Sequence, residues 1–314
     1  MLRYLLQRLL ATLPVLLVVA VVVFLLLHLT PGDPAAIIAG DSATEEQIQR
    51  IRAGLGLDRP LMTQFAIWSG SVLSGDLGES FFFKMTVSEL IRQRLEPTLA
   101  LALCTIFLSV LIAVPLGVVA ALRNGGWLDR ALMAFATLGF SIPVFVLGYL
   151  LMWLFALRLG WLPVQGYRRL SEGLWPFVQH LILPCVTLSV IYSPLIARVT
   201  RASVSEALTE DFVRTARAKG LPERRVILRH ALPNASVPIV TVIGVGLALL
   251  LGGVVVTESV YSIPGLGRLT VEAVLARDFP TIQALILLSS VTYVLLNLLI
   301  DLSYLLLDVR IRYR

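Results

Sequence analysis

Long apolar runs dominate this chain, and polar stretches rich in Arg, Glu, Gly and Pro separate them. Because a helix rises about 1.5 Å per residue, about twenty apolar residues cross the hydrocarbon of a bilayer. Six runs reach that length, and together they contain one charged residue, Asp301. We predict six transmembrane helices near residues 9–29, 97–122, 131–157, 177–197, 235–256 and 281–307.

The composition agrees with an all-α polytopic membrane protein. Hydrophobic residues occupy 57% of the 314 positions and charged residues only 15%, whereas about a quarter of a soluble domain is charged. The mean hydropathy is +0.86. The first run is also compatible with a signal peptide, but it is long for one, and the TPGDPAA that follows is a weak cleavage site. We therefore expect a retained helix.

The distribution of basic residues predicts the orientation. With a cytoplasmic N-terminus, the inside segments hold 15 of the 26 Lys and Arg residues and six acidic residues. The outside segments then hold 11 basic and 13 acidic residues. Since cytoplasmic segments of membrane proteins are enriched in Lys and Arg, both termini are expected to be cytoplasmic.

The polar stretches set the expected organisation. The segment after the first span is too long for a turn, and two capping boxes predict helices in it: Thr44 with Gln47, and Thr86 with Glu89, the second helix running towards Arg94. This segment either caps the membrane domain or meets an external delivery protein, and the two readings are compatible. The expected parts are an N-terminal helix (1–30), an external helical segment (31–96), a five-helix core (97–308) with a cytoplasmic loop (200–234), and a cytoplasmic tail (309–314).

The cytoplasmic loop carries the most informative pattern. Thr209 is placed to cap a helix whose first turn holds Glu210 and Asp211, and acidic residues suit the positive start of a helix. Gly220 predicts the end of that helix, and Pro222 suits the first position of a second short helix. The loop is thus expected to form two short helices on the inner face of the membrane.

One face of the first short helix is expected to be apolar, with Phe212, Val213 and Ala216 on it. Two such helices form a protrusion that a groove of another protein can hold. The simpler alternative is that the basic residues only anchor the loop on the inner side of the membrane. The basic residues around the apolar face are Arg214, Arg217 and Lys219.

Here the sequence resembles a known family. RTARAKG (214–220) and HALPN (230–234) are similar to the loop signature of bacterial ABC importer permeases: Glu-Ala-Ala, three residues, Gly, nine residues, Ile, one residue, Leu-Pro. Arg214, Thr215 and His230 depart from it, as is typical of the dipeptide and oligopeptide branch. The resemblance implies that the ATPase-coupling residues are Thr209, Glu210, Asp211, Phe212, Arg214, Thr215, Ala216, Arg217, Ala218, Lys219, Gly220, Leu232 and Pro233.

Other stretches extend this resemblance over essentially the whole chain. They resemble the first (B-type) permease subunit of dipeptide, oligopeptide, glutathione or nickel-chelate importers. These stretches are HLTPGDPA (28–35), LGLDRPL (55–61), GDLGES (75–80), SIPVF (141–145), ARVTRAS (197–203), PGLGRL (264–269) and DVRIRY (308–313).

The resemblance implies a type I ABC importer permease fold and a defined set of partners. These are a second, homologous permease subunit, two cytoplasmic ABC ATPase subunits, an external solute-binding protein and the inner membrane. It also implies that ATP and Mg²⁺ bind to the ATPases and that this chain binds no cofactor and is not an enzyme. The residues agree, because neither of the two lysines, Lys84 and Lys219, follows a glycine as a phosphate-binding loop requires.

Helix-breaking residues inside the spans are candidates for bends along a solute path, although ordinary packing variation also explains them. Asn297 and Asp301, one turn apart, form the clearest intramembrane polar pair. Asp301 has three possible roles: a functional charge, a partner of a terminal arginine, or an anchor for the second permease. The candidate bend residues are Pro115, Gly139, Pro143, Pro184 and Pro194.

Three other readings of the sequence are weaker. A secondary transporter would show ionisable residues near the midplane and repeated halves, and only Asp301 fits. A membrane enzyme is disfavoured because no GxSxG or HExxH motif occurs, and Cys104, Cys185 and the three histidines suggest packing rather than a metal site. A nickel-chelate importer shares the permease motifs and remains the alternative solute class.

Overall fold

The structure is a computed structural model that describes residues 2–29, 33, 35–36, 44–54 and 56–307. The DVRIRY stretch and the predicted tail lie outside the described residues. The described part is mostly helical, with a short two-stranded hairpin, and it divides into two compact units. The first unit draws on residues 1–96 and 268–294, and the second on residues 97–267 and 295–314.

The first unit contains the predicted external segment, and a buried acid fixes its hairpin. Ser80 and Thr281 donate hydrogen bonds to the same carboxylate oxygen of Asp278, whose side chain is almost fully buried. The hairpin is thereby tied to the start of a span. The elements are α1 (Leu2–Leu29), α3 (Glu45–Gly54), α4 (Leu61–Leu73), β1 (Glu79–Ser80), β2 (Met85–Thr86), the start of α5 (Val87–Leu122), most of α13 (Leu266–Leu275) and the first half of α14 (Phe279–Leu307).

The two predicted capping boxes have different outcomes. Thr44 and Gln47 exchange both hydrogen bonds, so the first box is confirmed. In the second, Thr86 accepts from the Glu89 amide, but the Glu89 carboxylate accepts from Arg92 instead of reaching back. The helix that starts there runs past Arg94 and continues through Pro97 as α5; prolines are tolerated inside transmembrane helices.

The second unit is a helical bundle built around α8, against which α6, α7 and α12 pack. Tyr261 lies in its largest core cluster and shares a hydrogen bond of 2.8 Å with Thr187 of α8. Cys185 is part of that cluster and Cys104 packs against it, as expected. The elements are the rest of α5, α6 (Trp127–Ser141), α7 (Val144–Leu151) with a π-helical extension (Met152–Arg158), α8 (Leu174–Ala207), α9 (Asp211–Ala218), α10 (Glu223–Val226), α11 (Leu232–Asn234), α12 (Ser236–Val260) and the end of α14.

Four described helices are long and apolar enough to cross a membrane, and the number reaches six when each of two bent helix pairs is one span. The predicted span 131–157 is one of these pairs rather than a single helix: it bends by 102° between Gly139 and Val144. The cause is Pro143, which lacks an amide donor and keeps Ile142 extended (φ −92°, ψ 121°). The other pair joins Glu223–Asn234 to Ser236–Leu250.

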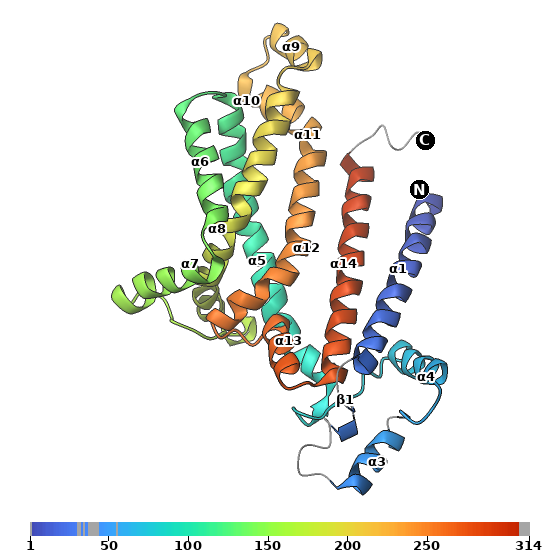
Figure 1. Cartoon of the computed structure of the whole chain (residues 1–314). Helices are drawn as coiled ribbons and strands as arrows, with labels where there is room; N and C mark the ends of the chain where they lie inside the picture. The colour runs from blue at the N-terminus through green and yellow to red at the C-terminus, as the bar shows by residue number, and fades with distance from the viewer. Residues whose placement is uncertain (1, 30–32, 34, 37–43, 55, 308–314) are drawn as a thin grey trace. The chain divides into compact units, whose positions relative to one another are not determined.

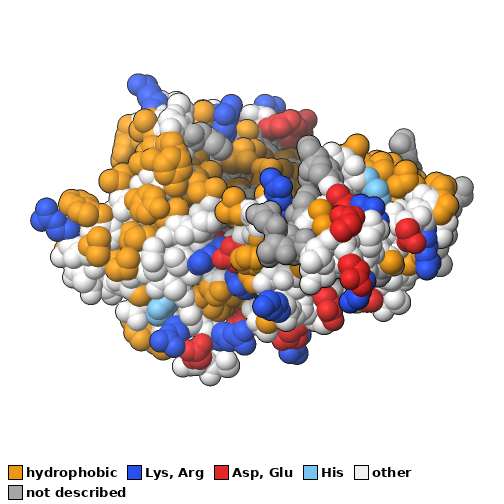
Figure 2. All heavy atoms as spheres, turned by 60° about the horizontal axis from the view of Figure 1, so that its bottom comes forward, with side chains coloured by type: hydrophobic (Ala, Val, Ile, Leu, Met, Phe, Trp, Pro, Cys, Tyr) orange, Lys and Arg blue, Asp and Glu red, His pale blue; other side chains and the backbone are white. Residues whose placement is uncertain are grey.

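The loop before the last span is partly helical. The SIPGLGRL stretch begins as a turn, with Ser262 at a positive φ of 51°, but it continues into helix α13. On the face shown in Figure 2, acidic and basic side chains are interspersed rather than separated by sign.

Candidate coupling site

The predicted coupling loop lies at the end of the second unit's bundle. α8 runs to Ala207, α9 follows after a short turn, and a second helical stretch leads from Glu223 to Asn234 into α12. Figure 1 shows α9 beyond the ends of α8 and α12, with α10 and α11 beside those ends. The two short helices expected from the sequence are therefore present.

The start of α9 corrects one expectation. Glu210, not Thr209, is the N-cap residue, and no side chain caps the helix. The Thr209 hydroxyl instead donates to the carbonyl oxygen of Glu206 at 2.7 Å. A threonine side chain can bond to a backbone carbonyl of the preceding helical turn instead of capping the next helix. The geometry allows this here because Leu208 still has helical dihedrals. Asp211 begins the helix, as expected for an acidic first turn.

The buried face of α9 is narrower than the sequence suggested. Val213 is fully buried and Ala216 nearly so, and both pack in a cluster with Ala121 of α5 and Val204 of α8. Phe212, expected on the same face, is 38% exposed. Adjacent residues of a helix point about 100° apart, so Phe212 cannot share the direction of Val213. It is left as a large apolar side chain on the outer surface of the loop.

The end of α9 agrees with the sequence at Gly220. This residue has φ +75°, a conformation that only glycine adopts without strain, and its amide donates to the Arg217 carbonyl at 2.9 Å. Leu221 donates to the Ala216 carbonyl, which closes the helix end. Pro222 is the N-cap of α10 rather than its first residue.

An ion pair joins the two short helices across this turn. The Arg217 guanidinium contacts the Glu223 carboxylate at 2.6 Å, and this hydrogen bond raises the pKa of Arg217 above its ordinary value. A second pair, Arg214 with Asp211 at 3.3 Å, lies on the outer surface. The other exposed coupling candidates on α9 and its end are Thr215, Ala218 and Lys219.

The second half of the signature lies where the chain turns into α12. Leu232 is half-buried and packs against the same cluster as Val213, whereas Pro233 is exposed. The helical stretch that ends with them meets α12 at a bend of 62°. The structure thus brings Leu232 and α9 onto one cluster, although the chain separates them by more than ten residues.

The candidate bend residues divide into two groups. Pro115, Pro184 and Pro194 lie inside continuous helices, and only Pro143 marks a break. Gly139 lies against α8: a Cβ at this position would be 2.9 Å from the Val190 carbonyl oxygen. It therefore permits a close helix contact with α8.

The proposed intramembrane pair is not joined directly. Asn297 is exposed, and no hydrogen bond connects it to Asp301 in the described part of the chain. Both residues lie on α14. No group of three or more His, Cys, Asp or Glu residues among those described could hold a metal ion.

The sequence did not reveal one buried ionic contact near the coupling loop. Arg201 of α8 contacts Asp129 of α6 at 2.7 Å, and Asp129 is only 5% exposed. Arg201 falls in the ARVTRAS stretch, but nothing in the sequence identifies a partner 72 positions earlier.

Comparison with known proteins gives consistent results over the whole chain. Residues 113–313 match the family described as binding-protein-dependent transport system inner membrane component, and residues 1–102 match the N-terminal segment of such membrane components. The chain is 52% identical over 310 residues to a probable peptide ABC transporter permease protein, y4tP, of Sinorhizobium fredii, covering 99% of each. It is 46% identical over 314 residues to the glutathione transport system permease protein GsiC of Salmonella choleraesuis, covering 100% of each.

A solved structure supports the fold. The inward-facing MetNI methionine ABC transporter has a chain that matches with a TM-score of 0.59 and 20% identity, covering 70% of this chain and 96% of that one. The expected six-span ABC importer permease fold is in keeping with this match and with the helices described above. The two family matches together span nearly every residue, and the chain therefore belongs to the family of binding-protein-dependent transport system inner membrane components.

Proposed function

We propose that this chain is the membrane-spanning permease subunit of an ATP-driven importer for small peptides, including glutathione-like peptides. Its full-length similarity to permeases named for peptide and glutathione transport supports this solute class. As a permease component, the chain supplies a path through the membrane, and ATP is hydrolysed on separate subunits.

The coupling helix of this proposal is α9. The observation that carries it is the division of α9 into two faces. Val213 and Ala216 are buried against α5 and α8, so a force on α9 reaches those membrane helices. Phe212, Arg214 and Lys219 lie on the outside, where an apolar side chain flanked by positive charge suits a cleft of an ATPase.

The assembly that we propose has four kinds of partner: a second homologous permease, two cytoplasmic ATPases, an external binding protein and the surrounding lipid. Both termini and α9 lie on the cytoplasmic side, and ATP with Mg²⁺ binds to the ATPases. Closure of the ATPase pair moves α9 and shifts the bundle between inward-open and outward-open states. The Arg217–Glu223 pair keeps α9 and α10 together during this movement.

The test is co-purification of the tagged chain expressed with its neighbouring genes, followed by ATPase assays in lipid nanodiscs. The expected result is a complex with a second permease and two ATPases, whose ATP hydrolysis rises when a peptide-loaded binding protein is added. Glutathione, a dipeptide and a nickel chelate are compared as solutes. If the chain purifies alone and moves solute on an ion gradient, the proposal is wrong; stimulation by the nickel chelate alone would overturn the peptide assignment.

A further inference from the structure

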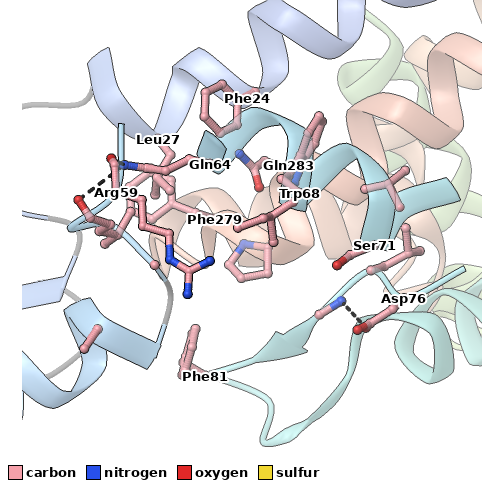
Figure 3. Close-up of a pocket in the computed structure, with 18 residues that line it drawn as sticks. Phe24, Leu27, Arg59, Gln64, Trp68, Ser71, Asp76, Phe81, Phe279 and Gln283 are labelled. Atoms are coloured by element: carbon pink, nitrogen blue, oxygen red, sulfur yellow. Dashed lines mark hydrogen bonds between the residues drawn. The ribbon is translucent and has the colours of Figure 1, made fainter. Parts of the chain in front are cut away.

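A cavity of about 410 Å³ lies in the first unit, apart from the coupling site. Its walls come from the end of α1, the link before α4, α4 itself, the β1 hairpin and the start of α14 (Figure 3). A space of this volume is within the range of small-molecule sites. None of the proposed transport machinery uses it.

The cavity is mainly apolar and aromatic. Phe24 and Phe279 are almost fully buried in its wall, and Trp68 and Phe81 complete an aromatic lining. The rings of Phe24 and Trp68 pack with centroids 5.7 Å apart. Of these rings, Trp68 is of a type enriched at the water–lipid interface of membrane proteins.

A shallow crevice, with an internal space of only about 10 Å³, continues from this cavity along a predicted span. It shares Trp68 and Gln283 with the larger space and extends over Ala284 and Leu287. These two residues lie one and two turns inside α14, which is apolar enough to cross a membrane. The hollow therefore follows the direction that an acyl chain takes into the bilayer.

α4, which forms one wall, leaves large apolar side chains exposed. It is a short apolar helix, and its exposed side chains include Met62 at 81% and Leu73 at 88% exposure. In water such exposure is unfavourable, whereas at the boundary of headgroups and acyl chains it is stabilising. α1 ends and α14 begins at the same cavity, so it lies at the level where two spans leave the hydrocarbon.

One cation faces this apolar space. Figure 3 shows the Arg59 guanidinium pointing into the cavity, and no described carboxylate lies within ion-pair distance of it. Gln64 fixes the segment by donating to the carbonyl oxygens of Leu57 and Arg59, at 3.3 and 2.7 Å. Asp76, at the other end of the lining, already accepts the Gly78 amide at 3.0 Å. An arginine at the edge of an apolar cavity suits a phosphate that carries an acyl chain.

We propose that this cavity binds a membrane phospholipid, with its phosphate on Arg59 and an acyl chain that starts in the aromatic cavity and continues over the surface of Ala284 and Leu287. The site ties the external segment to the bilayer surface. A peptide is a less suitable ligand, because its backbone would need polar partners in the cavity. The part of the wall between Arg59 and Asp76 consists mainly of apolar side chains.

The test uses the full chain in detergent and lipids with brominated acyl chains, which quench nearby tryptophan fluorescence. Because the chain has five tryptophans, the quenching that belongs to Trp68 is taken as the difference between the wild-type chain and Trp68→Phe. Brominated phosphatidylglycerol is compared with brominated diacylglycerol, which lacks the phosphate. We expect phosphatidylglycerol to quench at about a tenfold lower mole fraction, and Arg59→Gln to remove this advantage. Arg50→Gln, an exposed arginine of α3 that pairs with Glu46, is the matched control and keeps it.

Four outcomes would overturn the proposal. Equal quenching by the two lipids would show that no phosphate is recognised, and an advantage that survives Arg59→Gln would show that Arg59 does not bind it. Displacement by inorganic phosphate alone would show that the acyl chain contributes nothing. Displacement by glutathione or a tripeptide would identify the cavity as a solute site, whereas failure of solute-stimulated ATP hydrolysis would affect only the proposed function.

Discussion

Arg201 of α8 and Asp129 of α6 form a bridge between two membrane helices, with the guanidinium 2.7 Å from the carboxylate. Asp129 also accepts the amide of Gly125, and Arg201 also donates to the side chain of Asn124. The short loop between α5 and α6 is thus fixed to the part of α8 that leads into α9. The contact thus stabilises the end of α8, against which α9, the proposed coupling helix, packs.

The first prediction concerns this bridge. Asp129→Asn and Arg201→Gln should each lower the thermal stability of the chain, because each leaves a partly buried charge without its partner. The double variant should lose less than the sum, with a coupling free energy of about 1 kcal/mol. Tryptophan fluorescence during heating in detergent measures this, with Arg198→Gln, an exposed position on the same helix, as the control. Strictly additive losses would show that the contact contributes no stability.

Gly220 carries the second prediction. Its φ of +75° costs other L-residues about 1–2 kcal/mol and is closed to proline, which is held near φ −65°. Gly220→Pro should therefore abolish the stimulated ATP hydrolysis of the complex while its level in the membrane stays normal. Gly220→Asn, which tolerates this conformation, should retain most of the activity. Normal hydrolysis by a correctly inserted Gly220→Pro variant would refute a role for this turn in coupling.

Much of the fold was accessible from the sequence because its signals are local. Apolar runs predicted the long membrane helices, and Gly220 predicted where α9 ends. The capping box at Thr44 was likewise correct, since both its partners lie within one turn. The full-length resemblance to peptide-type permeases agrees with the family matches.

The features that the sequence missed depend on contacts between distant segments or on backbone direction. Whether Phe212 or Val213 is buried depends on where α5 and α8 end, which no local pattern specifies. The sequence offered Pro143 only as one of several candidate bends. Its local pattern does not distinguish it from Pro184, which lies in a helix that continues without a break. The pairing of Arg201 with Asp129 joins residues 72 positions apart, so it can be recognised only once the packing of α6 on α8 is known.

The third prediction tests the ion pair between α9 and α10. Arg217→Glu should reduce the coupling of solute to ATP hydrolysis, and adding Glu223→Arg should restore it because the swapped pair reforms across the turn. The pair is exposed and worth only about 0.2–1 kcal/mol, so neither single variant should lower the amount of protein in the membrane. If the swap fails to restore coupling, Arg217 acts through a partner protein rather than through Glu223.

The pH dependence of this pair follows from the sign of the shift. The hydrogen bond to Glu223 raises the pKa of Arg217, so the stability it contributes is fully present below the ordinary arginine pKa. It is lost only as pH rises through the still higher folded value. Stimulated hydrolysis by the wild-type complex should therefore show no loss from this pair between about pH 7 and pH 9. A fall in stimulated hydrolysis within this pH range, moved to lower pH by Arg217→Lys, would contradict this expectation.

The last prediction concerns the PGLGRL stretch, where Gly267 lies against α12. A Cβ at Gly267 would be 2.7 Å from the Cα of Val255, so the backbone itself would have to move. Gly267→Ala should destabilise the chain by about 1–3 kcal/mol, as overpacking of a fitted contact does. Gly70→Ala is the control, because that helical glycine has no atom within 4 Å of the added methyl group. Alanine should there be neutral or stabilising by up to about 1 kcal/mol. Thermal unfolding of both variants in the same detergent compares them, and equal midpoints would mean that the start of α13 does not pack closely on α12.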